Sequence, residues 1–117
     1  MKNILIVEDD RSSSDYYKAI LRDIKDYNIF SVDNTDNIFE LIKSNNIDLI
    51  FLDLKILPIN GFDVAKRIKV ELPHIKIIAQ TAYGHFQGED KLEYFDIFLE
   101  KPIPITTILE SIQSLLK

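Results

Sequence analysis

The sequence contains no cysteine and no tryptophan, and it has only three glycines and four prolines among its 117 residues. The absence of cysteine excludes disulfide bonds, thiolate metal sites and cysteine nucleophiles. No apolar run approaches the roughly 20 residues that a membrane-spanning helix requires, so we expect neither a membrane span nor a signal peptide. With three arginines and a net charge of −5, the chain is also poorly suited to binding nucleic acid.

The composition that remains is ordinary for a folded globular domain. Hydrophobic residues make up 46% of the chain and charged residues 28%. The length fits one domain of about 100–200 residues with a single core. We therefore expect one domain over residues 1–117, located in the cytoplasm.

Short apolar segments alternate with segments of helical periodicity. Residues 4–7 and 49–52 are apolar throughout, as strands buried on both faces are, whereas residues 29–32 are half polar and suit a sheet edge. The predicted strands cover residues 4–7, 29–32, 49–52, 75–79 and 97–99. Because about five helices alternate with them, the sequence predicts an α/β fold, with a parallel sheet, helices on both faces and right-handed crossovers.

Local signals mark the ends of these helices. Asp10 and the residues Asn34–Asp36 are candidate N-caps of the first two helices, and Pro104 suits the start of the last one. The stretch Gly84–Phe95 leaves room only for a short helix.

Polar residues follow the predicted strands, at the edge where ligands of parallel sheets gather. They are Glu8, Asp9 and Asp10 after the first strand, Asp53 after the third, Thr81 after the fourth and Lys101 after the fifth. Taken singly, each has an ordinary reading as a helix cap, a turn residue or a surface lysine. Jointly, clustered carboxylates without cysteine favour Mg²⁺ or Mn²⁺, and a carboxylate nucleophile with a hydroxyl and a lysine suits a phosphoryl acceptor.

The motifs that carry these residues resemble the receiver domain of two-component response regulators over essentially the whole chain. They are residues 4–9, residues 51–53 with Gly61 eight positions on, residues 78–82 and residues 101–103. The resemblance implies a three-layer, flavodoxin-like (βα)5 sandwich whose five parallel strands lie in the order 2-1-3-4-5.

The resemblance also implies roles for single residues. Asp53 would be the phosphoacceptor, and Mg²⁺ or Mn²⁺ would be held by Glu8, Asp9, Asp53 and the backbone carbonyl of Lys55. Thr81 would hydrogen-bond a phosphoryl oxygen, and Lys101 would pair with the phosphoryl group. The peptide bond between Lys101 and Pro102 is commonly cis in the family.

Three further positions would regulate the response. Phe98 occupies the position of the switch aromatic residue, which would act with Thr81. Lys55 and Tyr83 are the positions that would tune the dephosphorylation rate.

The chain departs from the family pattern at two places. Leu57 stands where proline is usual, with Pro58 displaced by one position, so the loop after Asp53 is expected to take a different path. Thr81 and Lys101 lie 20 positions apart, slightly closer than usual, and Tyr94 stands where glycine is frequent. We therefore expect a shortened, irregular fourth helix and an atypical surface for partner recognition.

These observations favour a phosphorelay switch. It would be a regulatory domain rather than an enzyme and would catalyse only its own phosphorylation and dephosphorylation. Its donor would be a sensor histidine kinase or a phosphotransfer protein. Its output would pass to another protein or an output domain, and it would act as a monomer or a phosphorylation-dependent homodimer.

Two alternatives remain open. A pseudo-receiver would be a protein-interaction module that does not depend on phosphorylation. A small enzyme of the same architecture, a phosphatase or a flavin protein, fits less well, because the loop after the first strand is acidic and lacks the expected nucleophile pattern.

Overall fold

The computed structural model describes residues 1–24, 26–82 and 93–117. Its five strands form one parallel sheet in the order β2-β1-β3-β4-β5, which confirms the predicted topology. The strands are β1 (Lys2–Val7), β2 (Tyr27–Val32), β3 (Leu49–Asp53), β4 (Lys76–Ala82) and β5 (Ile97–Lys101).

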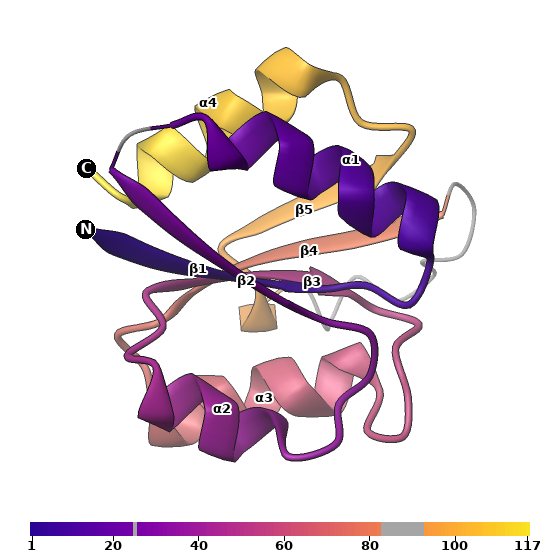
Figure 1. Cartoon of the computed structure of the whole chain (residues 1–117). Coiled ribbons are helices and arrows are strands. Elements are labelled where there is room, and N and C mark those ends of the chain that lie inside the picture. Colours follow the sequence, from indigo (N-terminus) through magenta and orange to yellow (C-terminus); the bar gives the residue numbers. More distant parts are fainter. Residues whose placement is uncertain (25, 83–92) are drawn as a thin grey trace.

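Helices cover both faces of the sheet and give three layers (Figure 1). Helices α1 (Arg11–Arg22) and α4 (Ile105–Leu115) lie on one face, and α2 (Ile38–Ser44) and α3 (Gly61–Glu71) lie on the other. No helix in the described part of the chain is both long and apolar enough to cross a bilayer.

The core divides into two clusters, one on each face of the sheet, because successive strand side chains point to opposite faces. In β3, Phe51 packs on the α1/α4 side, whereas Leu52 packs on the α2/α3 side. In β4, Ile78 and Ala79 divide in the same way. Strands β1 and β3 are buried along their apolar runs, as predicted, and β2 at the edge is only partly buried.

Several expected element ends were wrong. Strand β1 begins at Lys2 rather than Ile4, β4 runs from Lys76 to Ala82 rather than over residues 75–79, and β5 extends to Lys101 rather than Leu99. Strand β2 begins at Tyr27, two residues before the predicted start, because it pairs with β1 along the whole register from Lys2 to Val7. Helix α2 is capped by Asn37, which has a left-handed φ of 56° and no side-chain capping bond, rather than by residues 34–36. The N-cap predicted at Asp10 is confirmed, because its side chain accepts from the backbone N–H of Ser13.

The predicted irregular helix over residues 84–95 lies mostly outside the described residues. Within the described part, Glu93 and Tyr94 form a short 3₁₀ turn before β5. The four α-helices described here therefore leave that prediction open for residues 83–92.

Candidate functional site

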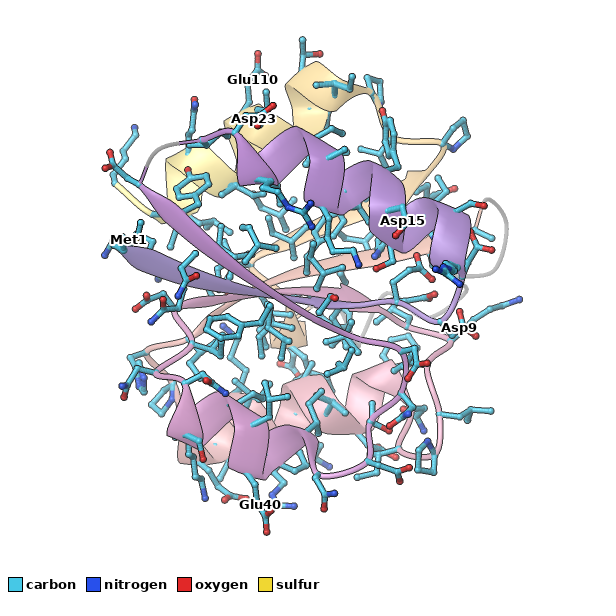
Figure 2. All side chains as sticks on the ribbon, viewed as in Figure 1. Met1, Asp9, Asp15, Asp23, Glu40 and Glu110 are labelled. Carbon is cyan, nitrogen blue, oxygen red and sulfur yellow. The ribbon has the colours of Figure 1, made fainter. Side chains whose placement is uncertain are left out.

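Three carboxylates meet where β1 and β3 end. One ligand oxygen each from Glu8, Asp9 and Asp53 lies within 4.8 Å of the others. Figure 2 shows Asp9 at this edge of the sheet, at the end opposite Met1. Glu8 and Asp53 are 1% and 5% exposed, whereas Asp9 is exposed to solvent. The site therefore has a buried anionic floor and an open acidic rim.

Lys101 reaches this cluster from the end of β5. Its Nζ donates to Glu8 Oε1 at 2.6 Å and lies 3.8 Å from Asp53 Oδ2. The Lys101–Pro102 peptide bond is cis, as expected from the resemblance. The lysine thus offsets one of the three negative charges, and the remaining two equal the charge of one divalent cation.

The pKa of Glu8 reflects its burial first and the neighbouring Asp53 second. Burial, together with the neighbouring Asp53 carboxyl, raises the pKa of Glu8 to about 7, against the lowering effect of Lys101. In this buried position the Glu8 carboxylate is costly to ionise without a cation beside it. Hard oxygen donors with an excess of negative charge fit Mg²⁺ or Mn²⁺, which favour carboxylate ligands and retained water.

Backbone groups of the following loop hold Asp53. The backbone N–H of Lys55 donates to Asp53 Oδ1 at 3.0 Å, and the N–H of Leu54 donates to the carbonyl of Gln80 at 3.0 Å. Lys55 is exposed, and no contact tests the metal-ligand role expected for its carbonyl. The loop therefore orients the carboxylate through a donor that was not predicted.

Close backbone packing beside Asp53 explains Gly61, the first residue of α3. A Cβ atom at this position would lie 2.6 Å from Leu54 Cα and 2.9 Å from the carbonyl oxygen of Asp53. Such distances are below van der Waals contact, so only glycine fits without displacing the chain that carries the carboxylate.

Hydrogen bonds from Thr35, in the connection between β2 and α2, fix the loop that contains Leu57 and Pro58. Thr35, 1% exposed, accepts from the Ile59 N–H at 2.6 Å and donates to the Ile59 carbonyl at 2.9 Å. The backbone N–H of Thr35 also donates to the carbonyl of Leu57. Leu57 itself is 67% exposed, and its bond to Pro58 is cis.

Thr81 lies near the carboxyl end of β4, and Phe98 of β5 packs on the α2/α3 side of the sheet. Thr81 is 2% exposed in β4, immediately after Gln80, the register partner of Asp53. Phe98 is partly buried against the α2/α3 cluster, with its ring 6.5 Å from that of Phe95. Tyr83, expected to tune the rate, lies outside the described residues.

One buried polar pair at this edge was not predicted as part of the site. Tyr17 of α1 donates through its hydroxyl to Gln80 Oε1 at 2.6 Å. The sequence places Tyr17 on the buried face of a helix, but nothing local indicates a partner 63 positions away.

Comparisons with known proteins agree with this geometry. The family model described as the response regulator receiver domain matches residues 4–113. The polar-differentiation response regulator DivK of Brucella anthropi is 27% identical over 119 residues, covering 98% of this chain and 96% of DivK. DivK of Brucella ovis is 26% identical with the same coverage.

Solved structures give the same result. The response regulator TrrA from Thermotoga maritima, in complex with Mg²⁺–BeF, superposes with a TM-score of 0.88 at 29% identity, covering 99% of this chain and 100% of TrrA. TrrA in complex with the histidine kinase ThkA superposes with a TM-score of 0.86 at 29% identity, covering 100% of both chains.

Proposed function

Because this chain belongs to the response regulator receiver domain family, we propose that it is a phosphorelay switch that accepts a phosphoryl group on Asp53. The observation that carries the proposal is the meeting of Glu8, Asp9 and Lys101 around a nearly buried Asp53. A carboxylate nucleophile, an acidic cation site and an ammonium group are the parts that phosphoryl transfer requires.

In the proposed reaction, an Asp53 carboxylate oxygen attacks the phosphorus atom of a phosphohistidine. The new O–P bond forms as the N–P bond breaks, and the imidazole nitrogen keeps the electron pair and takes a proton from solvent. Lys55 N–H orients the carboxylate, and Lys101 shifts from Glu8 toward the arriving phosphoryl oxygens. Asp53 is small and already held by its backbone neighbours, so little reorganisation precedes attack.

Glu8, Asp9 and Asp53 would hold Mg²⁺ or Mn²⁺, with the Lys55 carbonyl as a further ligand. When bound, the cation supplies positive charge that offsets the carboxylates and the phosphoryl oxygens. We assign Thr81 to hydrogen-bond a phosphoryl oxygen and, with Phe98, to change the partner-binding surface. Lys55 and Tyr83 are assigned to the lifetime of the phosphorylated form.

The donor we propose is a histidine kinase or a phosphotransfer protein in the cytoplasm. The similarity to TrrA, which has been crystallised with the kinase ThkA, supports this class of partner. The domain would catalyse only its own phosphorylation and dephosphorylation and would signal to a downstream protein or output domain, as a monomer or as a phosphorylation-dependent homodimer.

The decisive experiment is intact-mass measurement after incubation with acetyl phosphate and Mg²⁺. We expect one phosphoryl group on the wild-type chain and on Asp26→Asn, and none on Asp53→Asn or in excess chelator. Asp26 is a matched control, because it is an exposed aspartate just before β2, at the other end of the sheet.

A phosphoryl group on Asp53→Asn, or efficient labelling in chelator, would contradict the site assignment. No labelling of the wild type, together with no spectral change on adding beryllofluoride and Mg²⁺, would favour the pseudo-receiver instead.

A further inference from the structure

One asparagine of the chain, Asn60, is followed by glycine. The chain has seven asparagines, and the residues after the other six are isoleucine, threonine or asparagine. Branched side chains crowd the backbone nitrogen of the residue that carries them, whereas glycine has no Cβ atom and leaves its nitrogen open. The bond between Asn60 and Gly61, in the connection from Asp53 to α3, is therefore the bond of this chain most open to asparagine deamidation.

This reaction needs only the chain and water. The Gly61 nitrogen loses its proton to base and attacks the side-chain carbonyl carbon of Asn60. A C–N bond forms, the bond to the side-chain amide nitrogen breaks, and ammonia leaves with a proton returned by solvent. Water then opens the cyclic imide at either carbonyl and gives aspartate or isoaspartate, so that one water is consumed for each ammonia released.

The fold engages both reacting groups in hydrogen bonds. The backbone N–H of Gly61 donates to the carbonyl of Leu54 at 3.2 Å, and Gly61 is buried, so base cannot reach this proton. The Asn60 side chain makes two bonds to Asp63. Its Oδ1 accepts from the Asp63 N–H at 3.0 Å, and its Nδ2 donates to Asp63 Oδ2 at 3.0 Å.

The backbone of Asn60 also has the wrong geometry for attack. Its ψ is 159°, and ring closure requires the side chain to eclipse the Gly61 nitrogen about the Cα–C bond, far from this value. Rotation of ψ turns the Asn60 carbonyl, which accepts from the Val64 N–H at 3.1 Å in the first turn of α3. Reaction therefore requires this turn to open.

Opening of this turn is a local event. Asn60 and Asp63 are both exposed, and exposed ends of helices open at a lower free energy than the core does. The burial of Gly61 opposes the opening. We therefore expect the fold to slow deamidation at Asn60 without preventing it.

The two products affect the loop differently. Aspartate at position 60 keeps a side chain that caps helices as well as asparagine does. Isoaspartate lengthens the main chain by a methylene group. A carbon added to Gly61 would already lie 2.6 Å from Leu54 Cα and 2.9 Å from the Asp53 carbonyl oxygen, so the longer chain must displace the segment that carries the Asp53 carboxylate.

We propose that the bond between Asn60 and Gly61 is a site of spontaneous deamidation, gated by opening of the first turn of α3, and that the isoaspartyl product no longer accepts a phosphoryl group. The site and its gating are independent of the proposed function. The effect on phosphoryl acceptance rests on it.

The first test compares the chain aged in mildly alkaline buffer with the same chain aged in guanidinium chloride. Cleavage after Lys55 and Lys66 gives a peptide in which Asn60 is the only asparagine, and mass mapping of this peptide measures aspartate and isoaspartate. We expect deamidation at Asn60 to be about ten- to a hundredfold slower in the folded chain.

Variants test the gate. Asp63→Ala frees the Asn60 Nδ2 and should raise the rate in the folded chain about two- to fivefold, with no change in guanidinium chloride. Glu110→Ala is the control, because it removes an exposed acid from α4 on the other face of the sheet. Asn60→Ser keeps a capping side chain and should show no deamidation in this peptide.

The second test is acetyl phosphate labelling of the aged, folded chain with Mg²⁺. The fraction that no longer takes up a phosphoryl group should equal the isoaspartyl fraction. Freshly prepared Asn60→Asp should label like wild type, and Asn60→Ser should keep its labelling on ageing.

Equal rates in the folded and denatured chains, or an unchanged rate in Asp63→Ala, would overturn the gating. A folded chain that forms neither product at position 60, while the denatured chain does, would overturn the site. Full labelling in spite of isoaspartate would overturn the stated effect on phosphoryl acceptance. A fresh wild-type chain that takes up no phosphoryl group would instead contradict the proposed function, and the peptide measurement would still decide whether Asn60 is the site.

Discussion

Replacing Gly61 with alanine tests how closely the chain packs beside Asp53. Alanine is the better helix former, and in a helix interior the exchange would stabilise by about 0.5–1 kcal/mol. Against this, the new Cβ would lie 2.6 Å from Leu54 Cα and 2.9 Å from the Asp53 carbonyl oxygen. Both are backbone atoms, which cannot rotate away as a flexible side chain can.

The steric cost is expected to outweigh the gain in helix propensity. Overpacking of this kind costs about 1–3 kcal/mol, so we expect Gly61→Ala to lose a net of about 1–2 kcal/mol. At about 4 °C per kcal/mol for a domain of this size, the midpoint of thermal unfolding should fall by about 4–8 °C. Labelling by acetyl phosphate should also slow, because the displaced backbone carries the reacting carboxylate.

Urea unfolding followed by circular dichroism measures the first effect, and intact-mass labelling measures the second. Thr106→Ala is the control, since Thr106 is exposed in the first turn of α4 and its replacement gains helix propensity without a clash. Gly61→Ala with stability equal to or above wild type would refute the steric argument.

Three further predictions follow from the site and its supports. Because burial and Asp53 raise the pKa of Glu8 to about 7 from 4.5, the contribution of Glu8 to metal-free stability should be fully present below about pH 4.5 and lost as the pH rises through about 7. The difference in unfolding free energy between wild type and Glu8→Gln should follow this course. Mg²⁺ affinity measured by calorimetry should rise over the same pH interval, and an affinity independent of pH would contradict the assigned titration of Glu8. Lys101→Met removes the cation beside the buried Glu8 carboxylate. It should lower the free energy of unfolding by about 2 kcal/mol near pH 8, and by close to zero near pH 5, where Glu8 is protonated. A loss in urea unfolding that does not change with pH would count against the pairing of Lys101 with Glu8. Asn60 caps α3 by accepting from the Asp63 N–H at 3.0 Å, so Asn60→Ala should cost about 1 kcal/mol in thermal unfolding, and an unchanged midpoint would show that the cap contributes nothing.

The sheet could be predicted because its central strands are unambiguous. Residues 4–7 and 49–52 are apolar throughout, and buried parallel strands are the structures that require such runs. The start of β2 could not be found in this way. Tyr27 and Asn28 are in the strand because β1 supplies partners for them, and pairing across the sheet leaves no mark in the local sequence.

The acids and the lysine of the site could be predicted because the topology brings strand ends to one edge. The connections between distant loops could not. Thr35 looks like a helix cap, yet its hydroxyl bonds to Ile59, 24 positions away. Gln80 looks like one more strand residue, and only the fold shows that its amide meets Tyr17 and lies beside Asp53.

The two hydrogen bonds between the Thr35 hydroxyl and the Ile59 backbone have an evolutionary consequence. They fix the span between two connections that are far apart in the chain, one leaving β2 and one leaving β3. An insertion in either connection would pull the hydroxyl out of reach, so the lengths of the two should be inherited together. Relatives in which one of these loops has grown should therefore have lost the hydroxyl at the position of Thr35, or have changed the other loop to match.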